Sequence, residues 1–365
     1  MKRAAGVEIL NLTESNPTHA QLAMPEQAIV EAFADPRILH YDPNPAGILA
    51  AREAVSGYYL GEVAPDRILL TSSTSEAYGY LFKLLTDPGD EILVPRPSYP
   101  LFDFLAGMEL VSIAPYSLVY DGRWEIDFES IRRQTNQRTR AIVLVNPNNP
   151  TGSFLHSHEL EPLIEHCREH ELAIISDEVF ADYGFKDDPA RVRSLRTITD
   201  TPVFCLSGLS KIAGLPQVKL GWIVVGGPED WRREALTRLE LIADTYLSVG
   251  TPVQIAAPRL LDAGRQIRER ILERTRRNLD VLRASAGADS PFRLLNVEGG
   301  WCAILEVPRI RSEEEWVLEL LDRENVLVQP GFFYDFDSEA YLVLSLLTPP
   351  AIFDQGLAAI ERLAS

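Results

Sequence analysis

The feature that most constrains this chain is a regular alternation, from about Arg67 to Gly227, of short apolar runs with segments of helical spacing. Most of these runs are nearly continuous in Val, Ile and Leu, and we predict strands at 67–71, 91–95, 109–115, 141–147, 172–177, 202–207 and 221–227. Strands that are apolar on both sides are typical of a sheet buried under helices on both faces. The alternation therefore predicts an α/β domain with a mainly parallel sheet.

After about Pro228 the pattern changes to two long helical segments, which are followed by short strands and further helices. We expect the second long helix, from about Thr251, to bridge two domains. The first 40 residues are too irregular to fold alone. We therefore predict a large cofactor-binding domain at 41–260, and a smaller α+β domain formed by 1–40 together with 261–365.

The composition argues against several classes of partner. The chain has 365 residues and a net charge of −18, so it lacks the basic character that nucleic acid or an anionic membrane would require. No run reaches the ~18 apolar residues of a membrane span, and the N-terminus has no apolar core of a signal peptide. The three cysteines are far apart and imply no disulfide framework. We therefore expect a soluble cytoplasmic protein.

Unusual polar residues follow directly after five of the predicted strands. These segments are Ser73–Ser75, Pro97–Tyr99, Asn146–Gly152, Asp177 and Ser207–Lys211. In open α/β sheets, ligands bind beyond the carboxyl ends of the strands. We therefore predict that the five segments form one site.

Two of these residues can carry chemistry. Lys211 lies in the small-residue loop "SGLSK", where burial would favour its neutral amine, and a neutral amine can form an imine with an aldehyde. Asp177 ends the apolar strand "LAIISD", where a buried carboxylate needs a partner such as a protonated pyridine nitrogen. The alternatives are a surface lysine and an aspartate that only caps the next turn.

Three weaker signals accompany this pair. Ser73 and Glu76 have the spacing of a capping box, which marks a helix start whose free N–H groups can hold phosphate. "VNPNNPTG" would present the Asn149 amide, and the stiff loop "PRPSYP" could hold the Tyr99 ring flat against another ring. The alternatives are an ordinary loop and a core or interface tyrosine.

These residues, together with "HYDPNPAGILAAREAV" and its Tyr41, resemble the class I/II aminotransferases, which are pyridoxal-phosphate enzymes of fold type I. Order and approximate spacing agree from about residue 10 to 350. The resemblance implies that Lys211 holds the cofactor as an internal aldimine and shuttles a proton. It also implies that Asp177 keeps the ring nitrogen protonated, that Asn149 binds the ring hydroxyl and that Tyr99 stacks on the ring.

The resemblance further implies a set of residues that bind the cofactor phosphate. They are Ser73, Thr74, Ser75, Ser207 or Ser210, and Lys219. In this family the sites form at a dimer interface, so Tyr41 would reach the phosphate of the neighbouring subunit in a homodimer.

The chain departs from the family at four positions. Lys219 stands where an arginine is usual, which keeps the charge but loses the two-pronged contact. Gly208 replaces a frequent phosphate-binding serine, and Phe180 replaces a frequent tyrosine. Val343 occupies the place of the arginine that binds the substrate carboxylate. A valine cannot form this charge-assisted contact, which is worth about 1.5–3 kcal/mol.

Either another group binds the carboxylate, or the substrate lacks one at that place. Candidate groups are Asn16 and Thr18 in "ESNPT", Asn149, and Arg96 if it turns inward. The first hypothesis is an aminotransferase that moves an amino group between an amino acid or amine and a keto acid. The second is another pyridoxal-phosphate reaction, such as an elimination, a cyclisation or a decarboxylation, and the third is a non-catalytic descendant.

We predict no metal site. His166 and His170 share a helix face beside Cys167, but the charged segment "EPLIEHCREHE" is typical of a solvated surface.

Overall fold

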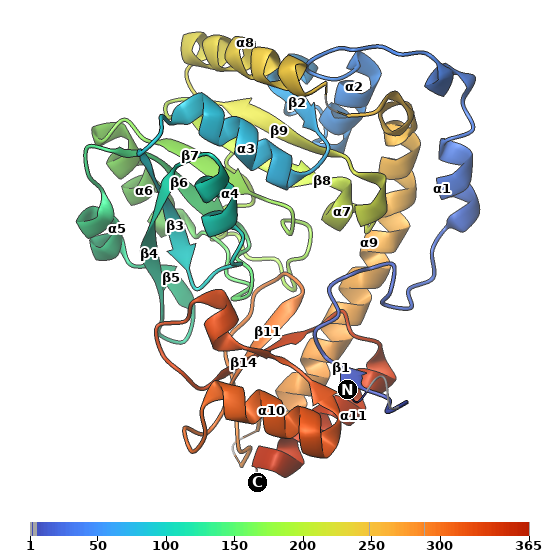
Figure 1. Ribbon diagram of the computed structural model, residues 1–365, viewed down its shortest axis with the longest axis vertical. Helices are drawn as coiled ribbons and strands as arrows, with labels where there is room; N and C mark the ends of the chain where they lie inside the picture. The colour runs from blue at the N-terminus through green and yellow to red at the C-terminus, as the bar shows by residue number, and fades with distance from the viewer. Residues whose placement is uncertain (1, 3–5, 248, 288, 365) are drawn as a thin grey trace.

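The computed structural model of the protein describes residues 2, 6–247, 249–287 and 289–364. The first and last residues of the predicted small domain, 1 and 365, therefore lie outside the described residues, as does residue 248 of the first predicted long helix. The described chain has a larger sheet in one half and a smaller sheet in the other, and one long helix runs along both (Figure 1).

The larger sheet contains eight strands within the described residues. Their spatial order is β2 (Ile68–Thr71), β9 (Gly221–Gly226), β8 (Val203–Gly208), β7 (Ala173–Asp177), β6 (Thr139–Val145), β3 (Glu91–Arg96), β4 (Ser112–Tyr120) and β5 (Trp124–Ile126). The run from β8 to β4 is parallel, whereas β9 is antiparallel to both of its neighbours and β5 to β4. The predicted mainly parallel sheet is confirmed, and β5 is an additional strand.

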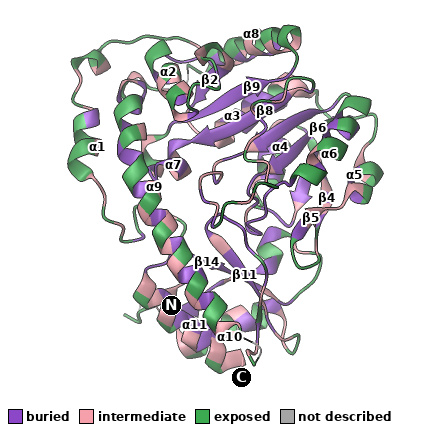
Figure 2. Cartoon of the chain, turned by 180° about the vertical axis from the view of Figure 1, so that it is seen from behind, coloured by how far each residue is buried: buried purple, intermediate pink, exposed green. Residues whose placement is uncertain are grey.

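Helices cover both faces of this sheet, as predicted. One face, which we call the α3 face, packs against α3 (Thr74–Leu85), α4 (Phe102–Met108) and α8 (Glu229–Tyr246). The other, the α9 face, packs against α2 (Leu49–Tyr58), α5 (Phe128–Gln134), α6 (Ser157–Glu169), α7 (Leu209–Ile212) and α9 (Thr251–Ser285). Figure 2 shows the strands buried between these layers.

Alternate residues of each strand point to opposite faces. On β8, Phe204 and Leu206 belong to the core of the α3 face, whereas Val203 and Cys205 belong to the core of the α9 face. These residues are almost completely buried. Full burial of such an aliphatic or aromatic side chain contributes about 1.5–3 kcal/mol, which explains why the strands are apolar on both sides.

The smaller sheet is antiparallel. Its order in the described chain is β10 (Arg293–Leu294), β11 (Cys302–Glu306), β14 (Tyr341–Ser345) and β13 (Gln329–Pro330). It packs against α10 (Glu313–Glu324) and α11 (Pro350–Ala364), with Trp316 and Phe353 fully buried between them. The N-terminal strand β1 (Leu10–Asn11) joins this half by pairing in parallel with β12 (Val326–Leu327).

The helix α9 connects the two halves. Ala256 and Leu260 in its first part lie in the core under the larger sheet, and Leu279 and Leu282 in its last part lie in the core of the smaller sheet. The short helix α1 (Glu26–Ala32) runs beside α9, where the side chain of Arg259 donates to the Glu31 carbonyl at 3.0 Å. Within the described ranges, no helix is both long and apolar enough to cross a membrane.

Candidate active site

Two of the five predicted segments, Ser73–Ser75 and Ser207–Lys211, meet the loop of Lys219 where β2, β9 and β8 lie side by side. Gly221, at the start of β9, pairs with Thr71 at the end of β2 and with Gly208 at the end of β8. A Cβ atom on Gly221 would lie only 3.2 Å from the backbone of Ser73. This close approach brings the start of α3, the start of α7 and the loop before β9 together.

Lys211 lies on the short helix α7, directly after β8, and its side chain is partly exposed. Its Nζ atom is 5.0 Å from the centre of the Trp301 ring and 5.7 Å from that of Phe180. Among the described residues this amine makes no hydrogen bond or ion pair. Burial lowers the pKa of Lys211, and the nearby Cys302 and Asp177 only partly oppose this effect. Lys211 is therefore a partly buried amine that gives up its proton more easily than a surface lysine.

The backbone of Lys211 is held by a tyrosine. The Tyr183 hydroxyl, which lies in a fully buried side chain, donates to the Lys211 carbonyl oxygen at 2.6 Å. The same tyrosine ring packs edge-on against Trp301. Tyr183 thus connects the helix that carries the amine to the aromatic wall beside it.

Asp177 ends β7 on the α3 face, close to Lys211. Burial raises its pKa to about 6, even though two donors stabilise its charge. These are the Val179 N–H, 3.2 Å from Oδ1, and the Tyr78 hydroxyl, 3.1 Å from Oδ2. A carboxylate oxygen can accept further hydrogen bonds. Asp177 therefore has room for one more, cationic, partner.

The start of α3 has the predicted cap, but only in part. The Ser73 hydroxyl accepts a hydrogen bond from the Glu76 N–H at 3.2 Å, as a capping box requires. The Glu76 carboxylate instead accepts from the Ser72 N–H, at 2.6 Å. Thr74 and Ser75 form the first turn, where backbone N–H groups have no partner within the helix.

Lys219 and Ser210 belong to the two other segments that meet near this helix start. Lys219 is exposed and sits two residues before Gly221, in the left-handed conformation with φ 55°. Ser210 is partly exposed on α7, next to Lys211. The arrangement brings a cation, a hydroxyl and free N–H groups to one edge of the sheet, which suits an anion.

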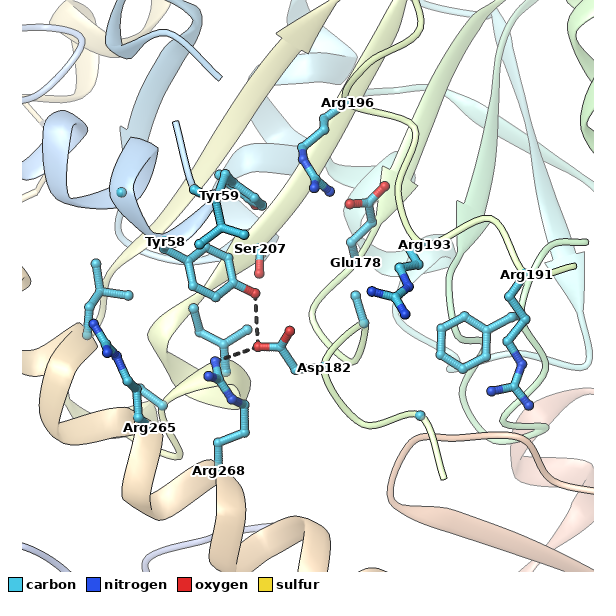
Figure 3. A pocket seen from close by; sticks show the side chains of 18 of the residues that line it. Tyr58, Tyr59, Glu178, Asp182, Arg191, Arg193, Arg196, Ser207, Arg265 and Arg268 are labelled. Carbon is cyan, nitrogen blue, oxygen red and sulfur yellow. Dashed lines mark hydrogen bonds and ion pairs between the residues drawn. The ribbon is translucent and has the colours of Figure 1, made fainter. Parts of the chain in front are cut away.

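Ser207 lies on the wrong side of the sheet for this cluster. Its side chain points to the α9 face, where it lines a cavity of about 790 Å³ with Tyr58, Glu178 and Asp182 (Figure 3). Its Oγ is buried and has no hydrogen-bond partner among the described residues. Because neighbouring residues of a strand point to opposite faces, Gly208, and not Ser207, faces the same way as Asp177.

The absence of a side chain at Gly208 has a packing reason. A Cβ atom there would lie 2.9 Å from both the Gly221 Cα and the Leu220 carbonyl oxygen. These are backbone atoms of β9 and of the residue directly before it, and they cannot move aside easily. In this chain a serine at position 208 would therefore push β8 and β9 apart.

The loop after β6 is fixed to the loop after β3. The Asn148 amide donates to the Pro97 carbonyl at 3.0 Å, and its oxygen accepts from the Ser98 hydroxyl at 3.2 Å. The next residue, Asn149, has its Oδ1 atom 3.6 Å from the Cys302 Sγ atom. Tyr99, beyond Ser98, is 49% exposed, so its ring is open to a ligand.

The remaining predicted residues are more peripheral. Asn16 uses its Oδ1 atom to accept from the N–H and the hydroxyl of Thr18. Arg96 forms an ion pair with Asp335 at 3.4 Å, so its charge is already compensated. Tyr41 is 73% exposed. Val343 is 1% exposed and belongs to the same core cluster as Trp301.

Sequence reasoning missed four residues around this site: Tyr78, Tyr183, Cys302 and Tyr334. Tyr78 reaches Asp177 across 99 positions of the chain, and Tyr183 bonds only to a carbonyl group. Cys302 and Tyr334 come from the smaller half. A weak signal existed only for Cys302, which follows the Gly-Gly-Trp sequence before β11.

His166 lies on α6, and His170 follows directly after this helix. His166 Nε2 lies 2.8 Å from the Thr135 hydroxyl, and burial lowers the pKa of this imidazole. Over the described residues, no group of three or more His, Cys, Asp or Glu side chains could hold a metal ion.

Comparison with known proteins decides the family. The sequence profile of the family "Aminotransferase class I and II" matches residues 7–351. The chain belongs to this family. The alanine aminotransferase of Mycobacterium tuberculosis is 28% identical over 380 residues, which cover 99% of this chain and 86% of that protein. The glutamate-pyruvate aminotransferase AlaA of Haemophilus influenzae is 25% identical over 375 residues, or 99% and 91% of the two chains.

Solved structures show the same fold. An alanine aminotransferase from Pyrococcus furiosus superimposes with a TM-score of 0.89 at 24% identity, covering 99% of this chain and 93% of the other. An aspartate aminotransferase from Thermotoga maritima gives a TM-score of 0.84 at 21% identity, covering 99% and 93%. The predicted family, the fold type and the aminotransferase activity are thus confirmed. The other two predicted functions find no support.

Proposed function

We propose that the aminotransferase uses pyridoxal 5′-phosphate, bound covalently through Lys211. The observation that carries this proposal is the pairing of a partly buried amine of lowered pKa with a buried carboxyl of raised pKa. Each group lacks a partner that this cofactor would supply: an aldehyde for the amine and a protonated ring nitrogen for the carboxylate. The residues present therefore fit the cofactor.

The bound cofactor would supply an electron sink for the pair left when a proton is removed from the substrate carbon. Lys211 would carry that proton between the substrate carbon and the cofactor, because its Nζ has no other polar partner in the described structure. Asp177 would hold a positive charge at the ring nitrogen, and Tyr78 would orient the carboxylate. Asn149 would bind the ring hydroxyl and Tyr99 would cover the ring.

The phosphate would lie at the start of α3. We propose Ser73, Thr74, Ser75, Ser210 and Lys219 as its ligands, since the meeting of β2, β8 and β9 brings these segments together. We leave Ser207 out, because its side chain points into the cavity on the other face. Lys219 would attract the phosphate as a point charge without the fixed geometry of an arginine.

The reaction would exchange an amino group between a donor and a keto acceptor, and Asn16 and Asn149 remain candidates for contacts with the substrate. We further propose a homodimer in which the exposed Tyr41 reaches the neighbouring site. The proposed domains remain 41–260, and 1–40 with 261–365, linked by α9. The proposed location is the cytoplasm, since the three cysteines are free.

Borohydride reduction tests the proposal directly. The purified protein is loaded with pyridoxal phosphate, reduced and digested, and the modified peptide is identified by mass spectrometry. The expected result is a single label on Lys211. The variant Lys211→Ala should lose the label and all turnover, whereas the exposed-lysine control Lys186→Ala should keep both. A label at another lysine, or an active Lys211→Ala enzyme, would refute the assignment.

A further inference from the structure

The cavity on the α9 face lies on the opposite side of the larger sheet from Asp177 (Figure 3). Its volume is about 790 Å³, and it is lined by the end of α2, the loop after β7 and the first half of α9. Sites for small molecules usually measure roughly 300–1,000 Å³. None of the described residues that we place around the cofactor lines this cavity, so it is a separate place for a molecule of metabolite size.

A hydroxyl without a partner faces this cavity from the sheet. Ser207 is 1% exposed, and in the described part of the chain its Oγ atom has no hydrogen-bond partner. A buried hydroxyl that lacks a hydrogen bond is destabilising, and such groups are nearly always paired in folded proteins. Ser207 can therefore bond to a polar group of a molecule in the cavity.

Arginine side chains surround the same cavity, although the chain as a whole carries a net charge of −18. The lining includes Arg191, Arg193, Arg196, Arg265 and Arg268. Figure 3 shows Arg265 and Arg268 reaching the cavity from α9, about one helical turn apart, and Arg193 and Arg196 on the other side of it. Guanidinium groups on two sides of one cavity are typical of a site for a carboxylate or a phosphate.

Two of these arginines have partners that are open to solvent. Arg193 is paired with Asp187 at 3.3 Å, and Arg265 is paired with Asp262 at 3.4 Å. In both pairs each side chain is at least 69% exposed, and exposed pairs contribute little to stability. Both guanidinium groups can therefore exchange these partners for an anion in the cavity.

Three further acidic residues line the cavity, and each already accepts a hydrogen bond from the chain. Asp182 accepts from Arg268 at 2.6 Å, and Asp188 accepts from the Ala190 N–H at 2.9 Å. Glu178 accepts from two serine hydroxyls and one backbone N–H. The groups left for a ligand therefore include the unpartnered hydroxyl and the two arginines with exposed partners.

We propose that this cavity binds a small organic anion that carries a carboxylate or a phosphate group. Arg265 binds the charged group through its two-pronged guanidinium, and Ser207 bonds to a second polar group of the molecule. Ile212 and Leu261 also line the cavity and contact the apolar part of the ligand. Binding at this cavity is independent of the cofactor, so its failure and the failure of the proposed function are distinguishable.

The ligand touches the two segments that carry the central residues of the active site. Ile212 follows Lys211 on α7, and Glu178 follows Asp177 at the end of β7. The cavity therefore lies directly behind Lys211 and Asp177. A displacement of about 1 Å at a catalytic group can change a rate by a factor of about 100. The bound anion is therefore expected to act as an effector of the reaction.

Calorimetry on the cofactor-loaded protein tests binding with 4-hydroxybenzoate, 4-hydroxyphenyl phosphate and the uncharged 4-hydroxybenzamide. None of these compounds is an amine or a keto acid, so none takes part in amino transfer. We expect at least one of the two anions to bind about tenfold or more tightly than the amide, because a charge-assisted contact is worth a factor of roughly 10 to 100. The tighter anion identifies the charged group as carboxylate or phosphate. Equally tight binding of the amide, or no binding of either anion, would overturn the proposal.

Two variants locate the binding. Ser207→Ala removes the unpartnered hydroxyl and should weaken binding of the tighter anion by a factor of about 3 to 10. Arg265→Gln removes the guanidinium charge and should weaken the same binding by a factor of about 10 or more.

Each variant has a matched control elsewhere in the chain. Thr201→Val removes another buried hydroxyl that lacks a partner in the described structure, and Arg233→Gln removes an arginine on α8 that is 69% exposed, as Arg265 is. Neither control residue lines the cavity, so both controls should bind the anion like the wild type. If Ser207→Ala or Arg265→Gln bound the anion as tightly as its control, the anion would lie elsewhere and the proposal would fail.

Turnover measurements test the effect on the reaction. The amino donor and the keto acceptor are kept at saturation, which excludes simple competition at the active site. A concentration of the tighter anion that fills the cavity should then change the turnover number of the wild type by a factor of about 2 or more. In Arg265→Gln the same change should require a higher concentration, in proportion to the weaker binding. An unchanged turnover number in the wild type would overturn the role as an effector.

Discussion

Replacing Asp177 by asparagine should stabilise the cofactor-free protein at neutral pH, although it removes a group needed for chemistry. Burial raises the pKa of Asp177 from 3.8 to about 6 in the folded chain. Between these values the folded protein keeps a proton that the unfolded chain has lost. The free energy of unfolding therefore falls as the pH rises through this range, and the penalty is complete above the folded-state pKa.

The size of the effect follows from the shift. Two pKa units, at about 1.4 kcal/mol per unit, correspond to about 3 kcal/mol. An asparagine stays neutral and avoids this penalty. The free energy of unfolding of Asp177→Asn should therefore exceed that of the wild type by up to about 3 kcal/mol at pH 7, and by almost nothing near pH 4. Urea unfolding of both cofactor-free proteins at pH 4, 5, 6 and 7, at one protein concentration, measures the difference.

A nearby aspartate provides the control. Asp182 accepts hydrogen bonds from the Tyr58 hydroxyl at 3.0 Å and from Arg268 at 2.6 Å, so its charge is compensated. Asp182→Asn should therefore destabilise the protein, by about 1–2 kcal/mol. The reasoning about Asp177 would be refuted if Asp177→Asn were destabilised like Asp182→Asn at pH 7, or if its gain did not change between pH 4 and 7.

Three further predictions concern the frame of the site. Gly208→Ala should lower the free energy of unfolding, measured with urea, by about 2 kcal/mol or more, because its Cβ would lie 2.9 Å from backbone atoms at β9. A decrease of less than about 0.5 kcal/mol would contradict this reasoning. Tyr183→Phe should lower the free energy of unfolding by about 1 kcal/mol in the same assay, because the Lys211 carbonyl loses its hydrogen-bond donor. An unchanged urea midpoint would show that this hydrogen bond does not stabilise the protein. Asp335→Asn should lower the free energy of unfolding by less than about 1 kcal/mol, because its ion pair with Arg96 is partly exposed. A decrease of more than about 2 kcal/mol that persists in 1 M salt would contradict this expectation.

The strands could be predicted because each is a short, continuous apolar run, and such a run is typical of a strand that is buried on both faces. The exception shows the limit of the pattern. The third predicted strand, 109–115, ended at residue 115, but the corresponding strand β4 continues to Tyr120, where it forms a hairpin with β5. Along β4 buried residues alternate with less buried ones, and Ser112 and Val119 are exposed, so the continuous apolar signal is lost.

The two central residues of the site were also within reach of the sequence. Lys211 and Asp177 stand out because a charged residue at the end of an apolar strand requires a reason. Which of Ser207 and Gly208 faces the same side as Asp177 could not be predicted, because this depends on the pairing of β8 with strands that are distant in the sequence. Tyr78 could not be found at all, since its partner is 99 residues away and a tyrosine in an apolar helix face is common in any core.

The N-terminal segment is completed by parts of the chain that are made much later. Leu10 pairs with Val326, the Ser345 N–H donates to the Leu12 carbonyl, and the Ser345 hydroxyl donates to the Glu14 carbonyl. At a synthesis rate of 5–20 residues per second, these partners leave the ribosome roughly 15 to 60 s after the segment itself. During that interval Leu12 lacks its cover, so a nascent chain stalled before β12 would expose it to chaperones and proteases.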